Sequence, residues 1–268
     1  MREHQVSAPD GARLHVSEQG TGRPVLLVQG LGDAGWTWRH QATAVAQVAR
    51  AVVLDNRGTG RSDATPGPYS IDLLADDAAA VLDDLGGGPA AVVGASMGGF
   101  VAQRLAQRRP DLVDALVLVA TTSGGPDAVG VPDETADAWR THATQPPHRF
   151  ARATMPLSFA PGWAETYPDL FERWLAARLE HPTSPAAWRA QYDAGAAFLA
   201  DGLPVGDLGA PVTVVHGTAD RVVPYANADV LLKRHPHAEL VTMNGCGHLC
   251  WLERPHVVNR LLVEVAAG

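Results

Sequence analysis

The chain has 268 residues, of which 46% are hydrophobic, and carries a formal net charge of −8 at pH 7. The negative charge argues against nucleic acid and an anionic membrane surface as partners, and no stretch approaches the ~20 apolar residues that cross a bilayer. The start of the chain lacks the apolar centre of a signal peptide, and two cysteines cannot form a disulfide framework, so we expect a reduced cytoplasmic protein.

Short apolar runs rich in β-branched residues alternate with amphipathic runs along most of the chain. Near the start, LHVSEQG predicts an antiparallel edge strand. The apolar runs are typical of strands buried on both faces of a parallel sheet, and they lie at 25–28, 51–54, 90–93, 115–120, 212–216 and 239–243. Helical patterns lie between them at 37–49, 71–85, 97–108, 226–234 and 256–266. This alternation predicts one α/β domain, in which a mostly parallel central sheet has helices on both faces.

The alternation stops between residues 124 and 208. That segment is rich in proline, contains amphipathic stretches such as DETADAWRTHA and DLFERWLAARLE, and has no strand-like run. We therefore predict a helical cap over 124–208, inserted into a core formed by residues 1–123 and 209–268. The cap contains Trp139, Trp163, Trp174 and Trp188. These tryptophans either form the core of a small helical layer or line an apolar pocket between cap and sheet.

The sequence VVGASMGGF at 92–100 places Ser96 between a predicted strand and a predicted helix. Its pattern G-x-S-x-G in that setting is typical of a nucleophile elbow, a tight turn that exposes the serine hydroxyl. Gly94 and Gly98 would let strand and helix approach closely, and the helix N-terminus would favour developing negative charge. The alternative is a serine N-cap beside a packing glycine.

A serine hydroxyl needs a base, and His248 in NGCGHLCWLERP is the best candidate because it follows the last predicted strand. Asp220 in HGTADRVVP follows the preceding strand and can orient the imidazole. His216 ends that strand, and we expect it to pack under the loop. The alternatives are a surface-loop histidine at 248 and a turn aspartate at 220. The order Ser96, Asp220, His248 agrees with α/β-hydrolases and not with other serine-hydrolase folds.

An oxyanion hole would complete such a site. Gly30-Leu31-Gly32 directly follows an early strand, so the backbone N–H of Leu31, together with that of Met97, can point at a carbonyl oxygen as it becomes negative. The alternative is a plain strand-to-helix turn, which also favours glycine.

With these residues in place, the chain resembles the α/β-hydrolase superfamily over almost its full length. The resemblance is carried by QGLGDAGW (29–36), LDNRGTGRSD (54–63), VVGASMGGFVAQ (92–103), HGTADRVVP (216–224) and GCGHLCWLERP (245–255). It is most similar to the small bacterial branch with a helical cap, which contains enol-lactonases, carboxylesterases and cofactor-free haloperoxidases. The resemblance implies Ser96 as nucleophile, Asp220 as acid and His248 as base. It also implies that Leu31 and Met97 are the oxyanion donors.

The resemblance further implies that Asp55 and Arg57 brace a loop and are not catalytic. One position departs from the family, which usually has His-Gly before the oxyanion residue where this chain has Gln29-Gly30. That histidine usually holds the loop by hydrogen bonds, and glutamine can also donate and accept them. Cys246, His248 and Cys250 alternate, but zinc sites commonly use wider ligand spacing and a fourth ligand, so we expect no metal and no cofactor.

These features predict a serine hydrolase that cleaves a small, apolar carboxylic ester or lactone through an acyl-enzyme on Ser96. The same three residues could instead serve C–C bond hydrolysis, perhydrolysis or the cyclisation of a natural-product intermediate. A third reading is a ligand receptor that has kept the hydrolase fold. The sequence does not choose a substrate, and an oligomer is compatible with it.

Overall fold

The computed structural model describes residues 1–268, and its centre is an eight-stranded sheet. The strands lie in the order β1-β2-β4-β3-β5-β6-β7-β8. β1 (Arg2–Ser7) pairs with β2 (Arg13–Gln19) and β2 with β4 (Arg50–Leu54), both antiparallel. All other pairings are parallel, and they join β3 (Pro24–Val28), β4, β5 (Ala90–Ala95), β6 (Val113–Val119), β7 (Val212–Gly217) and β8 (Glu239–Met243). The predicted α/β fold with a mostly parallel sheet is confirmed.

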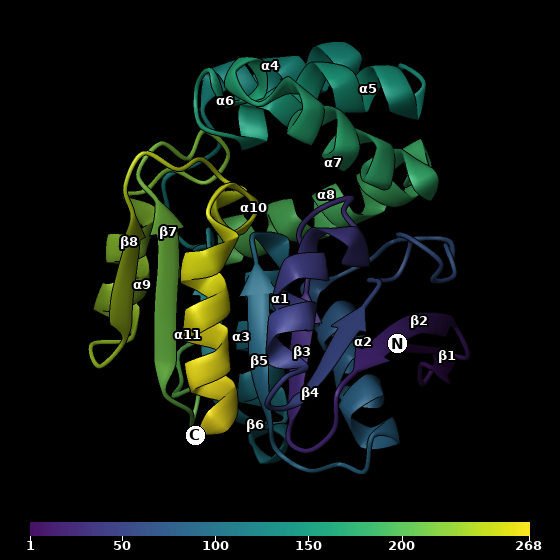
Figure 1. Ribbon diagram of the computed structural model, residues 1–268, viewed down its shortest axis with the longest axis vertical. Coiled ribbons are helices and arrows are strands. Elements are labelled where there is room, and N and C mark those ends of the chain that lie inside the picture. The colour runs from purple at the N-terminus through teal and green to yellow at the C-terminus, as the bar shows by residue number, and fades with distance from the viewer.

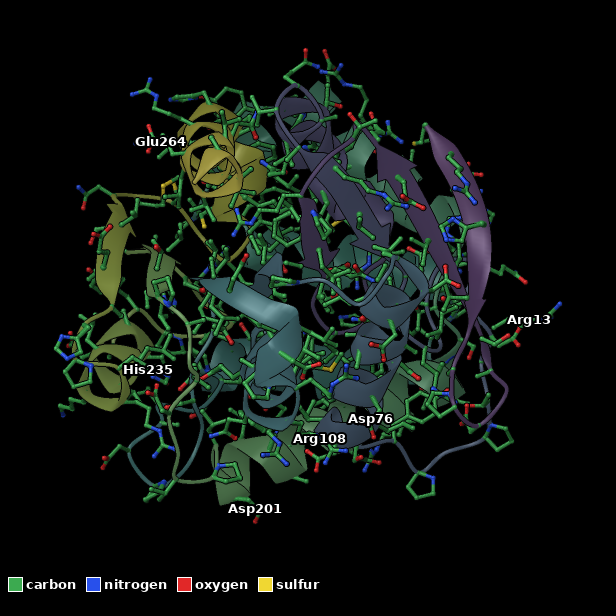
Figure 2. The ribbon with its side chains drawn as sticks, turned by 90° about the horizontal axis from the view of Figure 1, so that it is seen from below. Arg13, Asp76, Arg108, Asp201, His235 and Glu264 are labelled. Atoms are coloured by element: carbon green, nitrogen blue, oxygen red, sulfur yellow. The ribbon has the colours of Figure 1, made fainter.

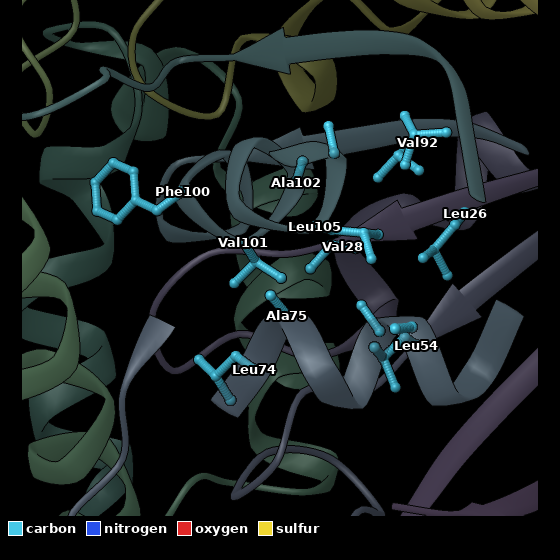
Figure 3. Packing of buried hydrophobic residues seen from close by; sticks show 14 of the residues in the cluster. Leu26, Val28, Leu54, Leu74, Ala75, Val92, Phe100, Val101, Ala102 and Leu105 are labelled. Carbon is cyan, nitrogen blue, oxygen red and sulfur yellow. The ribbon is translucent and has the colours of Figure 1, made fainter. Parts of the chain in front are cut away.

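Each face of the sheet is covered by helices because successive side chains of a buried strand point to opposite faces. On one face Leu26 packs in an apolar cluster with α2 (Ile71–Asp84), α3 (Met97–Arg108) and α9 (Asn227–Arg234). On the other face its neighbour Leu27 packs with α1 (Arg39–Val45) and α11 (Pro255–Ala267). Figure 1 shows α1 and α11 in front of the sheet, and Figure 3 shows α2 and α3 packed against its other face.

The ends of the core helices follow from local chemistry. α2 begins after Ser70, whose hydroxyl accepts a hydrogen bond from the Leu73 N–H at 3.0 Å, which satisfies one of the free N–H groups of the first turn. Charge pairs then join α2 to α3, as between Arg108 and Asp76 at 2.7 Å (Figure 2). Such exposed pairs contribute little stability, so the buried apolar face is what fixes these two helices.

Two elements differ from the sequence-based expectation. The helix expected at 37–49 is a 3-10 turn at Gly35–Trp38 followed by the shorter α1. β1 was not predicted, because only one of its residues is buried and REHQVS shows no apolar run. β1 pairs with β2 and forms the edge of the sheet. The predicted edge strand LHVSEQG is antiparallel as expected, but it is the second strand, because β2 pairs with β1 on one side and β4 on the other.

Between β6 and β7 the chain forms helices and loops only. They are α4 (Asp133–His142), α5 (Pro147–Thr154), a 3-10 turn at Met155–Ser158, α6 (Trp163–Thr166), α7 (Pro168–Glu180) and α8 (Pro185–Asp201). In Figure 1, α4 to α7 lie above the carboxyl ends of the parallel strands, and α8 runs between them and the sheet. None of the helices in the chain combines the length and the apolar content needed to span a bilayer.

Candidate active site

Ser96 lies at the sharp turn between β5 and α3. Its backbone has φ 53° and ψ −123°, a strained conformation for a residue with a side chain. The turn is possible because its flanking glycines have no Cβ. A Cβ on Gly94 would lie 2.2 Å from the Gly98 oxygen, and one on Gly98 would lie 2.2 Å from the Val28 oxygen. The strand, the helix and the nucleophile candidate are thus held at van der Waals distance from one another.

His248 and Asp220 come from two loops at the carboxyl end of the sheet. His248 Nδ1 lies 2.8 Å from Asp220 Oδ2, and the Asp220 side chain is fully buried. The carboxylate can only accept, so Nδ1 carries the proton and Nε2 is left as the acceptor. His248 and Ser96 line the same cavity. No hydrogen bond joins their side chains in this structure, and such contacts often tighten only when substrate binds.

Asp220 is held ionised by its surroundings. Its Oδ1 accepts from the N–H groups of Val222 (2.8 Å) and Val223 (2.9 Å). Burial alone would raise its pKa, but the charge of His248 and hydrogen bonds from His216 and His248 outweigh burial and lower the pKa to about 2. The carboxylate therefore stays charged throughout the neutral range.

His216 takes part in this network, which the sequence did not indicate. It is fully buried, as expected, and its Nε2 lies 2.9 Å from the Val223 oxygen and 3.4 Å from Asp220 Oδ2. Because a carbonyl can only accept, Nε2 carries the proton. The spacing of four residues between His216 and Asp220 is the signal that could have suggested this contact.

The loop that carries His248 is fixed by a carboxylate. Glu253 Oε1 accepts from the N–H of Gly247 at 2.9 Å and from the N–H of Ala160 at 2.8 Å. Burial raises the pKa of Glu253, while these two hydrogen bonds lower it. This residue joins the histidine loop to the segment that follows α5.

The loop after β3 lies directly against the serine. A Cβ on Gly30 would lie 3.0 Å from Ser96 Cβ and 3.4 Å from its Oγ. The hydrogen bonds of this loop join Asp33 N–H to the Gly30 oxygen and Gly32 N–H to a side chain of the cap, and they leave the Leu31 N–H free. Met97 is the first residue of α3, where N–H groups have no intrahelical partner. The structure thus places both predicted donors beside Ser96.

Residues of the cap clamp this loop. Gly32 N–H donates to Gln191 Oε1 at 2.9 Å, and the Thr183 hydroxyl donates to the Gly32 oxygen at 3.0 Å. Gln191 is fully buried and also donates to the Arg57 oxygen at 2.8 Å. The ring of Trp188 covers Gly32, where a Cβ would lie 2.6 Å from it. The cap therefore sets the shape of the loop, a role that no motif in the sequence predicts.

Gln29 does not hold the loop through its side chain. The residue is fully buried, and neither its Nε2 nor its Oε1 has a hydrogen-bond partner. Only its backbone oxygen is bonded, by Asn56 Nδ2 at 2.9 Å. The hydrogen-bonding role considered for this glutamine is therefore not seen, and the contacts from Gln191 and Thr183 hold the loop.

Asp55 and Arg57 act within the neighbouring loop. Asp55 Oδ1 accepts from Gly35 N–H at 2.7 Å, and Oδ2 accepts from Arg61 N–H at 3.0 Å. Arg57 is buried and donates to Asp77 at 2.6 and 2.9 Å, so that the loop is tied to α2. Neither Asp55 nor Arg57 lines the cavity that contains Ser96.

That cavity lies between the cap and the ends of the strands. It encloses about 940 Å³ including its mouth, which suits a small organic molecule. Four aromatic residues of the cap form one wall, and they are Trp139, Phe150, Trp188 and Tyr192. Trp188 is central to them, stacked on Tyr192 at 5.2 Å and edge-on to Trp139 at 6.0 Å. The wall is mostly apolar and its rings pack on one another, as expected for binding an apolar acyl or alkyl chain.

The four cap tryptophans divide between the two roles considered for them. Trp139 and Trp188 line the cavity. Trp163 and Trp174 are instead buried in an apolar cluster, where Trp163 stacks on Phe159 with ring centroids 4.2 Å apart. Tryptophan content alone could not separate pocket from core, because the answer depends on how the cap helices pack.

Comparisons with known proteins agree with this architecture. The family model described as alpha/beta hydrolase fold matches residues 23–255. A Mycobacterium tuberculosis protein with the provisional name non-heme bromoperoxidase BpoC is 33% identical over 264 residues, which cover 95% of this chain and 98% of the relative.

Two solved structures are also similar. A thermophilic esterase from Thermogutta terrifontis has a TM-score of 0.81 and 26% identity, and the match covers 99% of this chain and 98% of the esterase. Est816, described as an N-acyl homoserine lactone degrading enzyme, has a TM-score of 0.78 and 28% identity, and the match covers 97% of this chain and 98% of Est816.

Proposed function

The chain belongs to the α/β-hydrolase fold family, and we propose that it is a serine hydrolase of carboxylic esters or lactones that works through an acyl-enzyme on Ser96. The proposal rests above all on the contact between His248 Nδ1 and Asp220 Oδ2 at 2.8 Å. This contact fixes the tautomer that leaves Nε2 unprotonated, and His248 lines the same cavity as Ser96, whose backbone is strained. The named activities of the esterase and of Est816 support ester and lactone substrates.

The first half of the reaction forms the acyl-enzyme. His248 Nε2 takes the proton of the Ser96 hydroxyl as its oxygen attacks the substrate carbonyl carbon. Asp220 stays ionised and stabilises the imidazolium that results. The tetrahedral intermediate carries its negative charge on the former carbonyl oxygen. When the intermediate collapses, the bond to the alcohol oxygen breaks and His248 returns the proton to that oxygen.

Two backbone donors stabilise the intermediate. They are the N–H groups of Leu31, in the clamped loop, and of Met97, the first residue of α3. Each such donor contributes about 2.7–4 kcal/mol in the transition state. The α3 N-terminus adds a favourable field for the oxyanion.

The second half of the reaction releases the acid. Water gives a proton to His248 and attacks the acyl carbon, and the proton then passes to Ser96 Oγ as the acyl bond breaks. The mechanism uses only side chains and backbone of this chain. We place the reaction in the cytoplasm, in keeping with two cysteines that are both free and buried.

The test is the variant Ser96→Ala, assayed with a short p-nitrophenyl ester. We expect kcat to fall by about 10⁶-fold without loss of the fold, because no other hydroxyl occupies this position. Ser123→Ala is the matched control, since Ser123 is also buried but does not line the cavity. Full activity in Ser96→Ala would overturn the mechanism. Tight retention of a ligand with at most one turnover in the unmodified protein would favour the receptor reading.

A second candidate function is perhydrolysis, which the name of the 33% identical relative favours. In that reaction hydrogen peroxide replaces water in the second half. Its oxygen attacks the acyl carbon, which releases a peracid and restores the Ser96 hydroxyl. Supplying peroxide together with an ester and measuring peracid against acid separates the two functions. An excess of peracid at low peroxide concentration supports the second.

A further inference from the structure

Two charged residues line the cavity and have no part in the proposed mechanism. Asp33 follows the oxyanion loop by one residue, and Arg178 belongs to α7 of the cap. They are the only aspartate, glutamate, lysine or arginine side chains in the lining. Burial raises the pKa of Asp33, and the charges of Arg178 and then His248 offset part of that rise. Both residues line the same cavity as Ser96 and His248.

Asp33 and Arg178 form a loose ion pair with no hydrogen bond between them. Arg178 Nη1 and Asp33 Oδ1 are 3.7 Å apart, beyond hydrogen-bond distance, and Asp33 Oδ1 is buried with no partner. In contrast, Arg57 in the same protein donates to Asp77 at 2.6 and 2.9 Å and also binds Asp10. A buried acceptor without a hydrogen-bond partner is costly, and this one faces a cavity in which a ligand could supply the partner.

Neither residue is free to turn away to solvent. Both side chains are only 15% exposed. The Asp33 N–H is bonded to the Gly30 oxygen at 3.3 Å, and the preceding residue is clamped by Gln191. A ligand in the cavity therefore meets the Asp33 carboxylate as a fixed acceptor and the Arg178 guanidinium as a donor. Both lie in the cavity that contains Ser96.

The charges select the kind of group that can bind there. A carboxylate would pair with Arg178 but would be repelled by Asp33, and an ammonium group would meet the opposite problem. A neutral group with both a donor and an acceptor satisfies the two residues together. A secondary amide does so, because its N–H can donate to Asp33 while its carbonyl accepts from Arg178.

We infer that Asp33 and Arg178 form a specificity site for a secondary amide, or a neutral group with the same donor and acceptor pattern, next to the scissile ester or lactone carbonyl. The inference deepens the proposed function and rests on it. The aromatic wall around Trp188 would then hold the apolar chain beyond the amide. A substrate analogue without the amide would leave the buried polar groups of this site unpaired. Such a loss discriminates between substrates much more strongly than one methylene does in an apolar pocket.

The experiment compares two lactones with chains of equal length, an α-(hexanoylamino)-γ-butyrolactone and an α-heptyl-γ-butyrolactone. The quantity measured is the ratio of kcat/KM for the amide over the alkyl lactone, which cancels effects common to both. We expect the wild type to favour the amide. Asp33→Ala and Arg178→Gln should each lower the ratio about tenfold, as for the loss of one hydrogen bond to a charged group. Asp33→Asn keeps an acceptor oxygen, so its kcat/KM ratio should lie between the ratios of these two variants and that of the wild type.

Arg173→Gln is the matched control, because Arg173 lies exposed on the same helix and should leave the ratio unchanged. An unchanged ratio in both Asp33→Ala and Arg178→Gln, with melting temperatures near that of the wild type, overturns the inference alone. A wild-type preference for a chain ending in a carboxylate or an ammonium group over the amide also overturns it. If the wild type hydrolyses neither lactone nor a p-nitrophenyl ester, the proposed function fails as well, so the two failures are distinguishable.

Discussion

Replacing Gln191 by leucine tests whether the cap controls the oxyanion loop. Gln191 is fully buried, and its amide accepts from Gly32 N–H at 2.9 Å and donates to the Arg57 oxygen at 2.8 Å. Leucine has a similar volume but no polar atom. The variant therefore leaves one N–H and one C=O buried without partners, and each such group costs about 1–3 kcal/mol. We expect the free energy of unfolding to fall by about 2–6 kcal/mol.

The activity should fall by more than this loss of stability explains. The Gly32 N–H that donates to Gln191 belongs to the peptide directly after the one that carries the Leu31 N–H. Loss of this hydrogen bond therefore lets the Leu31 N–H move away from the oxyanion. Loss of one complete donor lowers kcat by about 10²–10³. Because the loop is also held by Thr183 and covered by Trp188, we expect a partial effect of about 10- to 100-fold in kcat, with a smaller change in KM.

The assay is steady-state hydrolysis of a p-nitrophenyl ester at a temperature where circular dichroism shows all variants folded. Gln41→Leu is the matched control, because Gln41 is also fully buried and donates two hydrogen bonds, to the Trp251 oxygen and to Asn259, but neither lines the cavity nor contacts the oxyanion loop. It should lose stability but keep its kcat. A Gln191→Leu variant whose kcat equals that of Gln41→Leu would refute the role given to the clamp.

The remaining predictions concern Asp220 and the serine turn. Asp220→Asn should lower kcat by about 10⁴-fold while the fold is kept, because the imidazole loses the partner that sets its tautomer. A pre-steady-state assay that finds the acylation rate unchanged would argue against this role. The pKa of Asp220 is about 2 in the folded chain, below its usual 3.8, so its carboxylate stabilises the fold above about pH 4 and loses that effect as the pH falls toward 2. Urea unfolding should therefore show the stability gap between wild type and Asp220→Asn shrinking by about 2 kcal/mol between pH 5 and pH 2, whereas a constant gap would contradict the shift. Gly98→Ala should fail to fold, because its Cβ would lie 2.2 Å from the Val28 oxygen, whereas Gly130→Ala, with no atom within 4 Å of its Cβ, should express and melt like the wild type.

The central sheet could be predicted because its strands are buried on both faces. β3, β4 and β5 are each almost wholly buried, so they appear in the sequence as unbroken apolar runs. The edge strand β1 has a single buried residue, and its sequence carries no comparable signal. Pairing with β2 determines the position of β1. Such tertiary contacts cannot be predicted from apolar periodicity.

The same distinction applies to the candidate site. Ser96, Asp220 and His248 each follow a strand, so the parallel sheet brings their loops to one edge, and short motifs are enough to find them. The contacts that support them join residues far apart in sequence. Gln191 reaches Gly32 across 159 positions, and this contact depends on how α8 of the cap docks on the core. The orphaned Asp33 oxygen is likewise visible only once α7 has brought Arg178 beside it.

The most direct test of the account is to trap the nucleophile. The protein is treated with a p-nitrophenyl alkylphosphonate, which transfers its phosphonyl group to an activated serine hydroxyl and releases p-nitrophenol, and the labelled peptide is identified by mass spectrometry. The account predicts one phosphonyl group per chain, on Ser96, with esterase activity lost in the same proportion and no labelling in His248→Ala. A label on another residue, or full activity after Ser96 is modified, would contradict it.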